Sequence, residues 1–181
     1  MKYIITTCLF FMLSAVAAYS QLYTTRTGLI GFYSKTPLED IKADNKQVYA
    51  AIDAAKKNLA FSLLMKGFLF ERALQQEHFN ENYVESDKFP KASFSGMYSG
   101  EVNMQKDGSY PVTVKGNLTI HGVTKNLETP ATLEVKSGRL LGNAKFNISP
   151  EDYAIIIPSL VRDKIAKQVT ISIQIDCNPS K

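Results

Sequence analysis

The sequence has few of the residues on which most catalytic and metal sites depend. Its 181 residues include only two histidines and two cysteines, and tryptophan is absent. It contains no G-x-S-x-G, phosphate-loop or H-E-x-x-H motif. Two histidines without a spaced carboxylate or cysteine are also a weak signal for zinc. These absences argue against an enzyme, and we expect no catalytic residue, no cofactor and no metal site.

One of the two cysteines lies in a stretch that we leave out of the fold. Residues 1–20 combine Lys2, a continuous apolar run and the small residues Ala18-Tyr19-Ser20, the pattern of a signal peptide cleaved before Gln21. The run is shorter than a spanning helix needs. We therefore expect no stable membrane anchor and a periplasmic or secreted protein.

With Cys8 removed, Cys177 has no partner for an internal disulfide. A link between two chains, and with it a homodimer, is possible in an oxidising compartment. The position of Cys177 on an apolar face favours a different interpretation, a small buried hydrophobic residue.

Charge and organisation exclude further classes. The formal net charge of +4 is spread without long runs, and no basic stripe with interleaved aromatics suggests a nucleic-acid partner. Nothing in the sequence indicates attraction to a membrane surface. Without an internal repeat or a Pro/Ser-rich linker, residues 21–181 are expected to form one domain.

The second half of the chain alternates apolar and polar residues with the period of half-buried strands. The alternation covers 92–104, 112–120, 133–148 and 169–177, and Lys106-Asp107-Gly108 and Ser137-Gly138 are hairpin signals. Consecutive antiparallel strands with one apolar face must stack or close on themselves, and closure removes exposed edges. The sequence therefore predicts an all-β fold.

The first half is ambiguous. Segment 48–64 has the alanine content of a helix, but two strands at about 46–53 and 59–68 explain it equally well. Thr36-Pro37-Leu38-Glu39 predicts a short helical turn from its capping residue and early proline. A second short helix is predicted over 71–79, where it could cover one end of a barrel.

Two segments resemble the YceI-like family of exported lipid-binding proteins. They are 77-EHFNENYVESDKFPKASFSG-96, with its F-P-x-A-x-F strand start, and 116-GNLTIHGVTKNLETPATLEV-135. The resemblance covers the mature chain, with Gly28 to Tyr33 in the first strand. It implies an extended, lipocalin-like antiparallel barrel of about eight strands, one or two short helices, a hairpin at 46–68, and a lumen for a long apolar chain such as a polyisoprenoid.

The inward side of the strands supplies the candidate ligand contacts. Aromatic residues there are mixed with small ones, such as Gly96, Gly116 and Ala144, and glycine inside a strand often marks space or a bend. From inward parity we predict a ligand-binding lumen formed by Phe94, Tyr98, Val102, Val114, Leu118, Ile120, Lys125, Phe146, Ile171 and Ile173.

The hairpin at 120–123 holds two residues with open interpretations. His121-Gly122 fits a two-residue turn with positive φ, so we favour a structural role for His121 over catalysis or metal binding. Lys125 pairs with Leu118 if the loop has two residues. It is then either a partner for the polar head of a lipid or a solvated residue at a bulge or barrel end.

The functional prediction is enclosure of an amphiphilic lipid with a long apolar tail, for carriage, storage or sequestration. Two alternatives stay open. One is a lipid-modifying enzyme that uses groups near Glu77 and His78, and the other is a ligand-free structural or stress-response barrel packed solid with its own side chains.

Overall fold

The segments with alternating apolar and polar residues form strands of an antiparallel sheet in the computed structural model, which describes residues 22–180. The predicted signal peptide, with Cys8, and the predicted cleavage site before Gln21 lie outside the described residues. The strands are β1 (Leu22–Lys35), β2 (Asp40–Asp53), β3 (Asn58–Leu64), β4 (Leu69–Phe70), β5 (Lys91–Ser99), β6 (Gly108–Ile120), β7 (Val123–Lys136), β8 (Arg139–Ile148) and β9 (Val169–Pro179).

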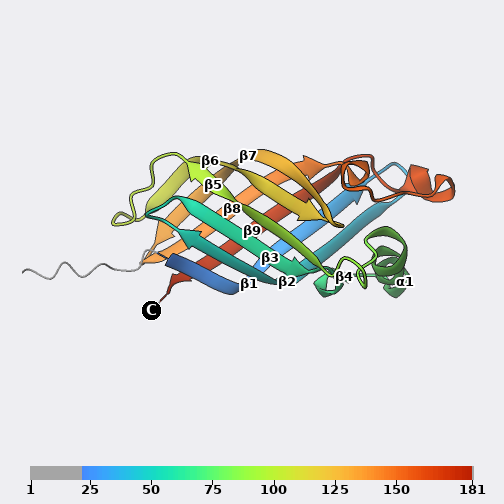
Figure 1. The fold of residues 1–181 in the computed structure, drawn as a ribbon, viewed down its shortest axis with the longest axis horizontal. Helices are drawn as coiled ribbons and strands as arrows, with labels where there is room; N and C mark the ends of the chain where they lie inside the picture. The colour runs from blue at the N-terminus through green and yellow to red at the C-terminus, as the bar shows by residue number, and fades with distance from the viewer. Residues whose placement is uncertain (1–21, 181) are drawn as a thin grey trace, which may run out of the picture.

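The sheet closes into a barrel. Neighbouring strands pair in the order β1-β9-β8-β7-β6-β5-β3-β2, and β1 also pairs with β2, so the eight strands have no outer edge strand (Figure 1). The two-residue β4 adds to β2 outside this circuit. The predicted fold class, a lipocalin-like barrel of about eight strands with a short helix, is confirmed.

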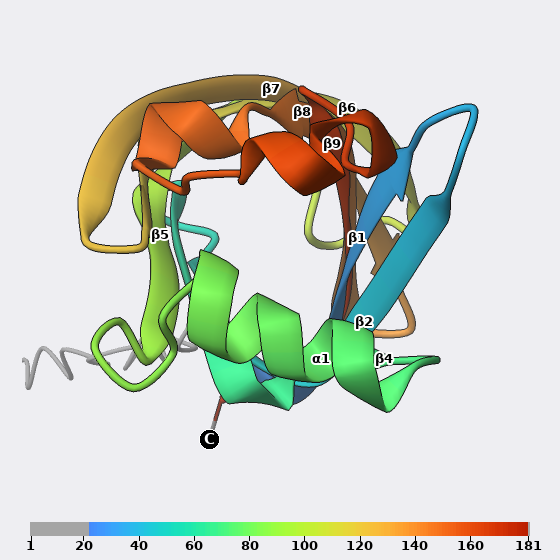
Figure 2. The same ribbon diagram turned by 90° about the vertical axis from the view of Figure 1, so that its right-hand side faces the viewer.

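Helical segments gather at one end of the barrel, which we call the open end. They are η1 (Met65–Gly67), α1 (Ala73–His78), the π-helical η2 (Phe79–Tyr83), η3 (Pro150–Tyr153) and η4 (Ser159–Lys164). A view onto this end shows α1 on one side of the opening and the η3–η4 segment on the other (Figure 2). The short helix predicted over 71–79 therefore lies where a barrel cover was expected.

The ambiguous first half forms strands. The hairpin implied for 46–68 is confirmed as β2 and β3, joined by a turn in which Lys57 has a φ of 57°. The helix suggested by alanine content loses because Ala50 and Ile52 point into the core while their neighbours face outwards. Tertiary burial thus overrides helix propensity.

The helical turn predicted at Thr36-Pro37-Leu38-Glu39 is wrong. This segment is the loop of the β1–β2 hairpin. Thr36 Oγ1 accepts hydrogen bonds from the backbone N–H groups of Leu38 (3.2 Å) and Glu39 (3.0 Å), so the capping chemistry is present. No helix follows, because residues from Asp40 onward pair with β1.

The predicted hairpin turns at His121-Gly122 and Ser137-Gly138 are confirmed, whereas the strand predicted over 92–104 is shorter than expected. His121 and Gly122 have φ values of 52° and 73°, and Ser137 and Gly138 have 51° and 77°. The strand predicted over 92–104 instead ends at Ser99, and residues 100–107 form a longer loop before β6.

The other end of the barrel, which we call the packed end, is filled by side chains. Its buried cluster includes Ala50, Ile52, Tyr98, Val112, Val135, Leu140 and Cys177. Leu140 and Cys177 are completely buried, and burial raises the pKa of the Cys177 thiol to about 11. The interpretation of Cys177 as a small buried hydrophobic residue is confirmed.

The strands β7 and β8 separate toward the open end. They pair from Lys136 and Arg139 only as far as Ala131 and Ala144. Beyond that point β7 continues with β6 to Val123, whereas β8 continues with β9 to Ile148. Figure 2 shows β7 arching outside the η3–η4 segment, so this part of β7 has no strand partner on its β8 side.

Candidate functional site: an apolar lumen

A lumen of about 460 Å³ lies between the packed end and the helical segments. Its volume falls within the range of small-molecule binding pockets. The wall is almost wholly aliphatic and aromatic, and it includes Phe32, Phe61, Phe94, Val114, Leu118, Leu127, Phe146, Ile171 and Ile173. The packed-end residues Ile52, Leu59 and Ile175 form its floor.

Seven of the ten residues predicted to contact ligand line this lumen. They are Phe94, Val114, Leu118, Ile120, Phe146, Ile171 and Ile173. They come together because β5, β6, β8 and β9 pair without a register shift, so inward parity is kept along each strand. Phe94 faces Leu118 across β5 and β6, and its ring lies edge-on to Phe61 with centroids 6.3 Å apart.

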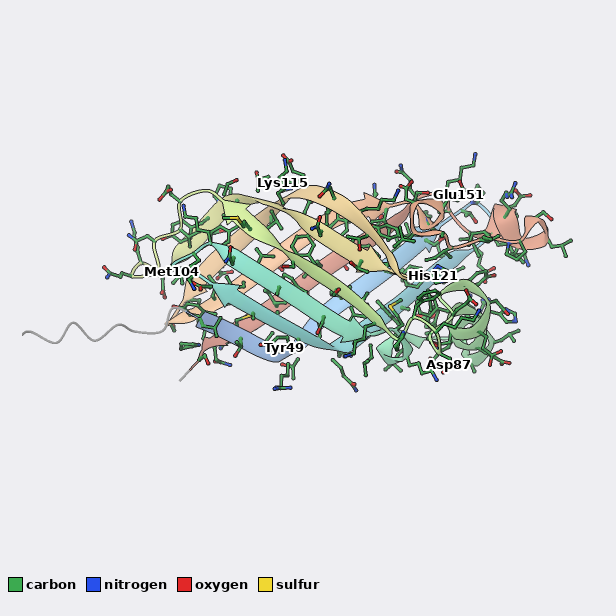
Figure 3. All side chains as sticks on the ribbon, viewed as in Figure 1. Tyr49, Asp87, Met104, Lys115, His121 and Glu151 are labelled. Carbon is green, nitrogen blue, oxygen red and sulfur yellow. The ribbon has the colours of Figure 1, made fainter. Side chains whose placement is uncertain are left out.

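The other three predicted residues lie outside the lumen lining. Tyr98 is buried in the packed end, where its hydroxyl donates to the Ala54 carbonyl at 3.4 Å. Desolvation there raises the pKa of Tyr98. Val102 follows the end of β5 and lies in the loop at the packed end with Met104, which Figure 3 shows far from the helical segments.

Lys125 is exposed, although it has the predicted register with Leu118. No bulge interrupts the β6–β7 pairing. Lys125 belongs to the part of β7 that has lost its β8 neighbour, so its side chain reaches water at the barrel end. Of the alternatives for this residue, the structure therefore supports the solvated one.

Two glycines of the inward face allow close packing between strands. Gly96 and Gly116 oppose each other on β5 and β6. A Cβ on either glycine would lie within 2.4 Å of a backbone oxygen on the neighbouring strand and within 2.8 Å of the Phe94 ring. These two glycines accommodate an aromatic ring of the protein and do not line the lumen.

A cluster of phenylalanines forms the cover of the open end. The ring of Phe79 stacks on Phe32 at 5.8 Å, and also contacts Phe70 at 5.0 Å and Phe68 at 5.6 Å. These four residues line the lumen. Sequence reasoning missed them because Phe68, Phe70 and Phe79 come from a short strand and helical turns without strand periodicity. The only local signal was the Phe68-Leu69-Phe70 spacing.

Charged groups of the lumen lining are confined to the opening. Glu39 Oε1 accepts hydrogen bonds from Arg72 Nη1 (3.0 Å) and Gln75 Nε2 (2.8 Å), which ties the β1–β2 loop to the α1 segment. Lys164 and His78 also line the opening, and both are exposed. An amphiphile can therefore find apolar contacts inside and charged groups only at the mouth.

Glu77 and His78, which the enzyme alternative would use, do not converge on the lumen as a pair of catalytic groups. Both are exposed on α1, and Glu77 is not part of the lumen wall. Across residues 22–180, no three His, Cys, Asp or Glu side chains are grouped as metal ligands. None of the helices in this described range is long and apolar enough to cross a bilayer.

His121 joins three segments at the open end. Its Nδ1 lies within hydrogen-bonding distance of the Tyr153 carbonyl oxygen, at 3.0 Å, and its Nε2 lies 3.1 Å from Glu85 Oε2. Its ring also lies edge-on to Phe89 at 4.3 Å. The β6–β7 hairpin is thereby fastened both to loop 84–90 and to η3. The turn role of His121 is confirmed, and the tertiary contacts add to it.

Both partners of His121 are hydrogen-bond acceptors. An imidazole can donate from both nitrogens only when it is doubly protonated. The pKa of Glu85 is lowered by its hydrogen bonds to Lys88 and, next, to His121. Three of the five non-glycine residues with positive φ in the described chain lie at this junction: Glu85, His121 and Ala154.

The comparisons with known proteins agree with this architecture. A family model of the YceI-like domain matches residues 20–177. The chain belongs to the YceI-like family. No curated protein matches it in sequence.

Solved structures share the fold of this chain at low sequence identity. A polyisoprenoid binding domain from Saccharophagus degradans, implicated in plant cell wall breakdown, superposes with a TM-score of 0.76 at 13% identity, over 88% of this chain and 99% of that one. BcnA of Burkholderia cenocepacia gives 0.70 at 15%, over 82% and 95%. The Campylobacter jejuni YCEI protein gives 0.61 at 16%, over 77% and 85%.

Proposed function

We propose that this YceI-like protein binds an amphiphilic lipid with a long apolar tail, such as a polyisoprenoid, inside its barrel. The observation that carries the proposal is an apolar lumen of about 460 Å³. Charged groups in its lining lie beside its opening. The Saccharophagus degradans domain of the same fold is described as polyisoprenoid binding, which supports this ligand class.

The driving force is removal of the tail from water. Burial of apolar area stabilises by about 25 cal/mol per Å², or about 0.8 kcal/mol per methylene. The tail lies against Phe94, Leu118, Phe146, Ile171 and Ile173, where no side-chain hydrogen bond has to be broken. Selectivity then comes from the shape of the lumen and from the polar groups at its mouth.

The protein acts by binding and does not transform its ligand. This part of the proposal rests on the lack of converging acid, base or nucleophile in the lumen lining. We further propose that residues 1–20 direct export and that the mature protein carries, stores or sequesters the lipid in the periplasm or outside the cell. A homodimer stays a prediction.

Native mass spectrometry of detergent-free protein, followed by extraction and identification of lipids, tests the proposal. We expect a stoichiometric adduct with a long apolar tail. Protein that is consistently bare, and that takes up no added isoprenoid, contradicts the proposal and favours the ligand-free alternative.

Adjacent residues of opposite parity provide a blocking variant and its control. Ala144 lines the lumen, whereas Lys145 is exposed on the outer surface of β8. Ala144→Trp places an indole in the space of the tail and should abolish the adduct. Lys145→Trp adds the same group outside and should leave the adduct unchanged.

A further inference from the structure

Exposed apolar side chains gather at the open end of the barrel. Most of the large hydrophobic residues that are exposed in the described chain lie there, at the end of β3, on β4 or on the loop and helical segments: Leu38, Leu64, Leu69, Leu74, Ile156 and Leu160. Figures 1 and 2 show these segments around the opening. Scattered exposed hydrophobic residues are normal, but a group around an opening indicates an interaction site.

The η3–η4 segment carries the two most exposed of these residues. Ile155, Ile157 and Val161 line the lumen, while Ile156 and Leu160 are 80% and 94% exposed. The same short segment therefore presents apolar side chains to the lumen and to the outside. No contact within residues 22–180 explains the outward pair.

Leu38 extends this apolar surface. It is 67% exposed in the β1–β2 loop. The base of that loop is joined to the residues after η4, because the Ala166 N–H donates to Ser34 Oγ at 2.8 Å. Figure 2 shows the β1–β2 connection beside the η3–η4 segment.

Basic side chains flank the apolar tips. Arg162, Lys164 and Lys167 are exposed, and Asp163 is the only acidic residue between Ile155 and Gln168. Within the described part of the chain, none of the three cations takes part in a salt bridge. Exposed carboxylates lie outside this stretch, at Glu151 and Asp152 on η3 and at Glu77 and Glu81 on the α1–η2 side of the opening.

We propose that Leu38, Ile156 and Leu160, together with Arg162, Lys164 and Lys167, form a docking face for membrane surfaces that carry anionic phospholipids. Apolar tips that enter the interface beside cations that meet phosphate groups are the chemistry of peripheral membrane binding.

The docking face rests on the proposed lipid-binding function, because it gives the lumen a purpose at the membrane. A lipid leaving the bilayer would pass from the interface along Ile156, Ile157 and Val161 into the lumen with little exposure of its tail to water. A membrane is favoured over a second copy of the chain because the apolar residues are separate loop tips around an opening with unpaired cations.

Flotation with phospholipid vesicles tests the docking face. Protein from the full chain is mixed with phosphatidylcholine vesicles, or with vesicles in which roughly one third of the lipid is phosphatidylglycerol. Its intact mass shows whether residues 1–20 remain, so that binding by a leader is recognised. We expect the protein to float with anionic vesicles and to be released by high salt.

Three variants divide the contributions. Ile156→Ser combined with Leu160→Ser should lower the bound fraction about tenfold, because two apolar anchors are lost. Met97→Ser is the matched control, since Met97 is 56% exposed on the outer surface of β5, and it should change nothing. Arg162→Gln combined with Lys167→Gln should weaken binding to anionic vesicles only.

The outcomes distinguish this inference from the proposed function. Wild-type protein that holds a lipid adduct but floats with neither vesicle type overturns the docking face and leaves lipid binding intact. Equal flotation of wild type and the Ile156/Leu160 variant also overturns it. A concentration-dependent dimer that this variant abolishes, without flotation of wild type, would assign the surface to a second copy.

Discussion

The two ends of the barrel are built from the same strands and treat apolar side chains in opposite ways. At the packed end, β7 and β8 stay paired, and Leu133, Val135 and Leu140 fill the interior. At the open end the two strands separate, and the interior is bounded by phenylalanines from the cover segments and by η3. Loss of one strand pairing thus converts a core into a lumen.

The largest expected effect is loss of the packed core. Leu140→Ala removes a completely buried side chain, and rigid surroundings leave a cavity. The free energy of unfolding should fall by about 2–5 kcal/mol. Urea denaturation of lipid-free protein measures it. A loss below about 1 kcal/mol would show that the packed end is loose and would remove the contrast between the ends.

The next effect concerns the junction at His121. His121→Asn keeps a residue that tolerates positive φ but is too short to reach both Tyr153 and Glu85. Hydrogen exchange in residues 84–90 and 150–155 should rise about tenfold, because two hydrogen bonds that fasten the open end are lost. Ser137→Asn, at the matching turn of the packed end, should leave that exchange unchanged.

The same junction should respond to pH. Hydrogen bonds to Lys88 and then to His121 lower the pKa of Glu85, so the stability that its carboxylate contributes is present above the ordinary carboxyl pKa and is lost as the pH falls through the lowered value. Hydrogen-exchange protection of residues 84–90 should therefore be greater at neutral pH than below the lowered pKa of Glu85. Equal protection at the two pH values would show that the Glu85 carboxylate does not fasten the junction.

Truncation of a side chain that lines the lumen should lower the free energy of unfolding less than truncation of a side chain in the packed core. Leu118→Ala widens a space that is already open, so the free energy of unfolding should fall by only about 1 kcal/mol. Lipid affinity should fall severalfold, because contacts with the tail are lost. Comparison with Leu140→Ala in lipid-free protein tests the difference, and equal losses would mean that the lumen is packed.

The smallest effect is expected at Lys125. Because its side chain is exposed outside the lumen lining, Lys125→Met should leave lipid retention unchanged, as measured by native mass spectrometry. Reduced retention of a phosphorylated lipid would restore Lys125 to the binding site and extend that site across the edge of β7.

The elements that could be predicted are those in which one face of a strand is buried. Alternation in β6, β8 and β9 was enough to place Val114, Phe146 and Ile171 on the inner face. The turn at His121-Gly122 followed from local chemistry. In these segments local pattern and tertiary environment demand the same conformation.

The elements that could not be predicted depend on distant contacts. Thr36 makes capping bonds that would suit a helix, and only the β1–β2 pairing decides against one. Lys125 has inward parity, yet the separation of β7 from β8 exposes it. The partners of His121 come from segments more than 30 residues away, and nothing in the local sequence identifies them.

The break between β7 and β8 also affects aggregation. From Val123 to Pro130, β7 has a free edge on its β8 side, and free edges can recruit a strand from another molecule. This edge carries Pro130, which has no N–H to donate, beside the exposed charges of Lys125 and Glu128. Such features block strand addition, so the barrel can be open at one end without becoming a template for fibrils.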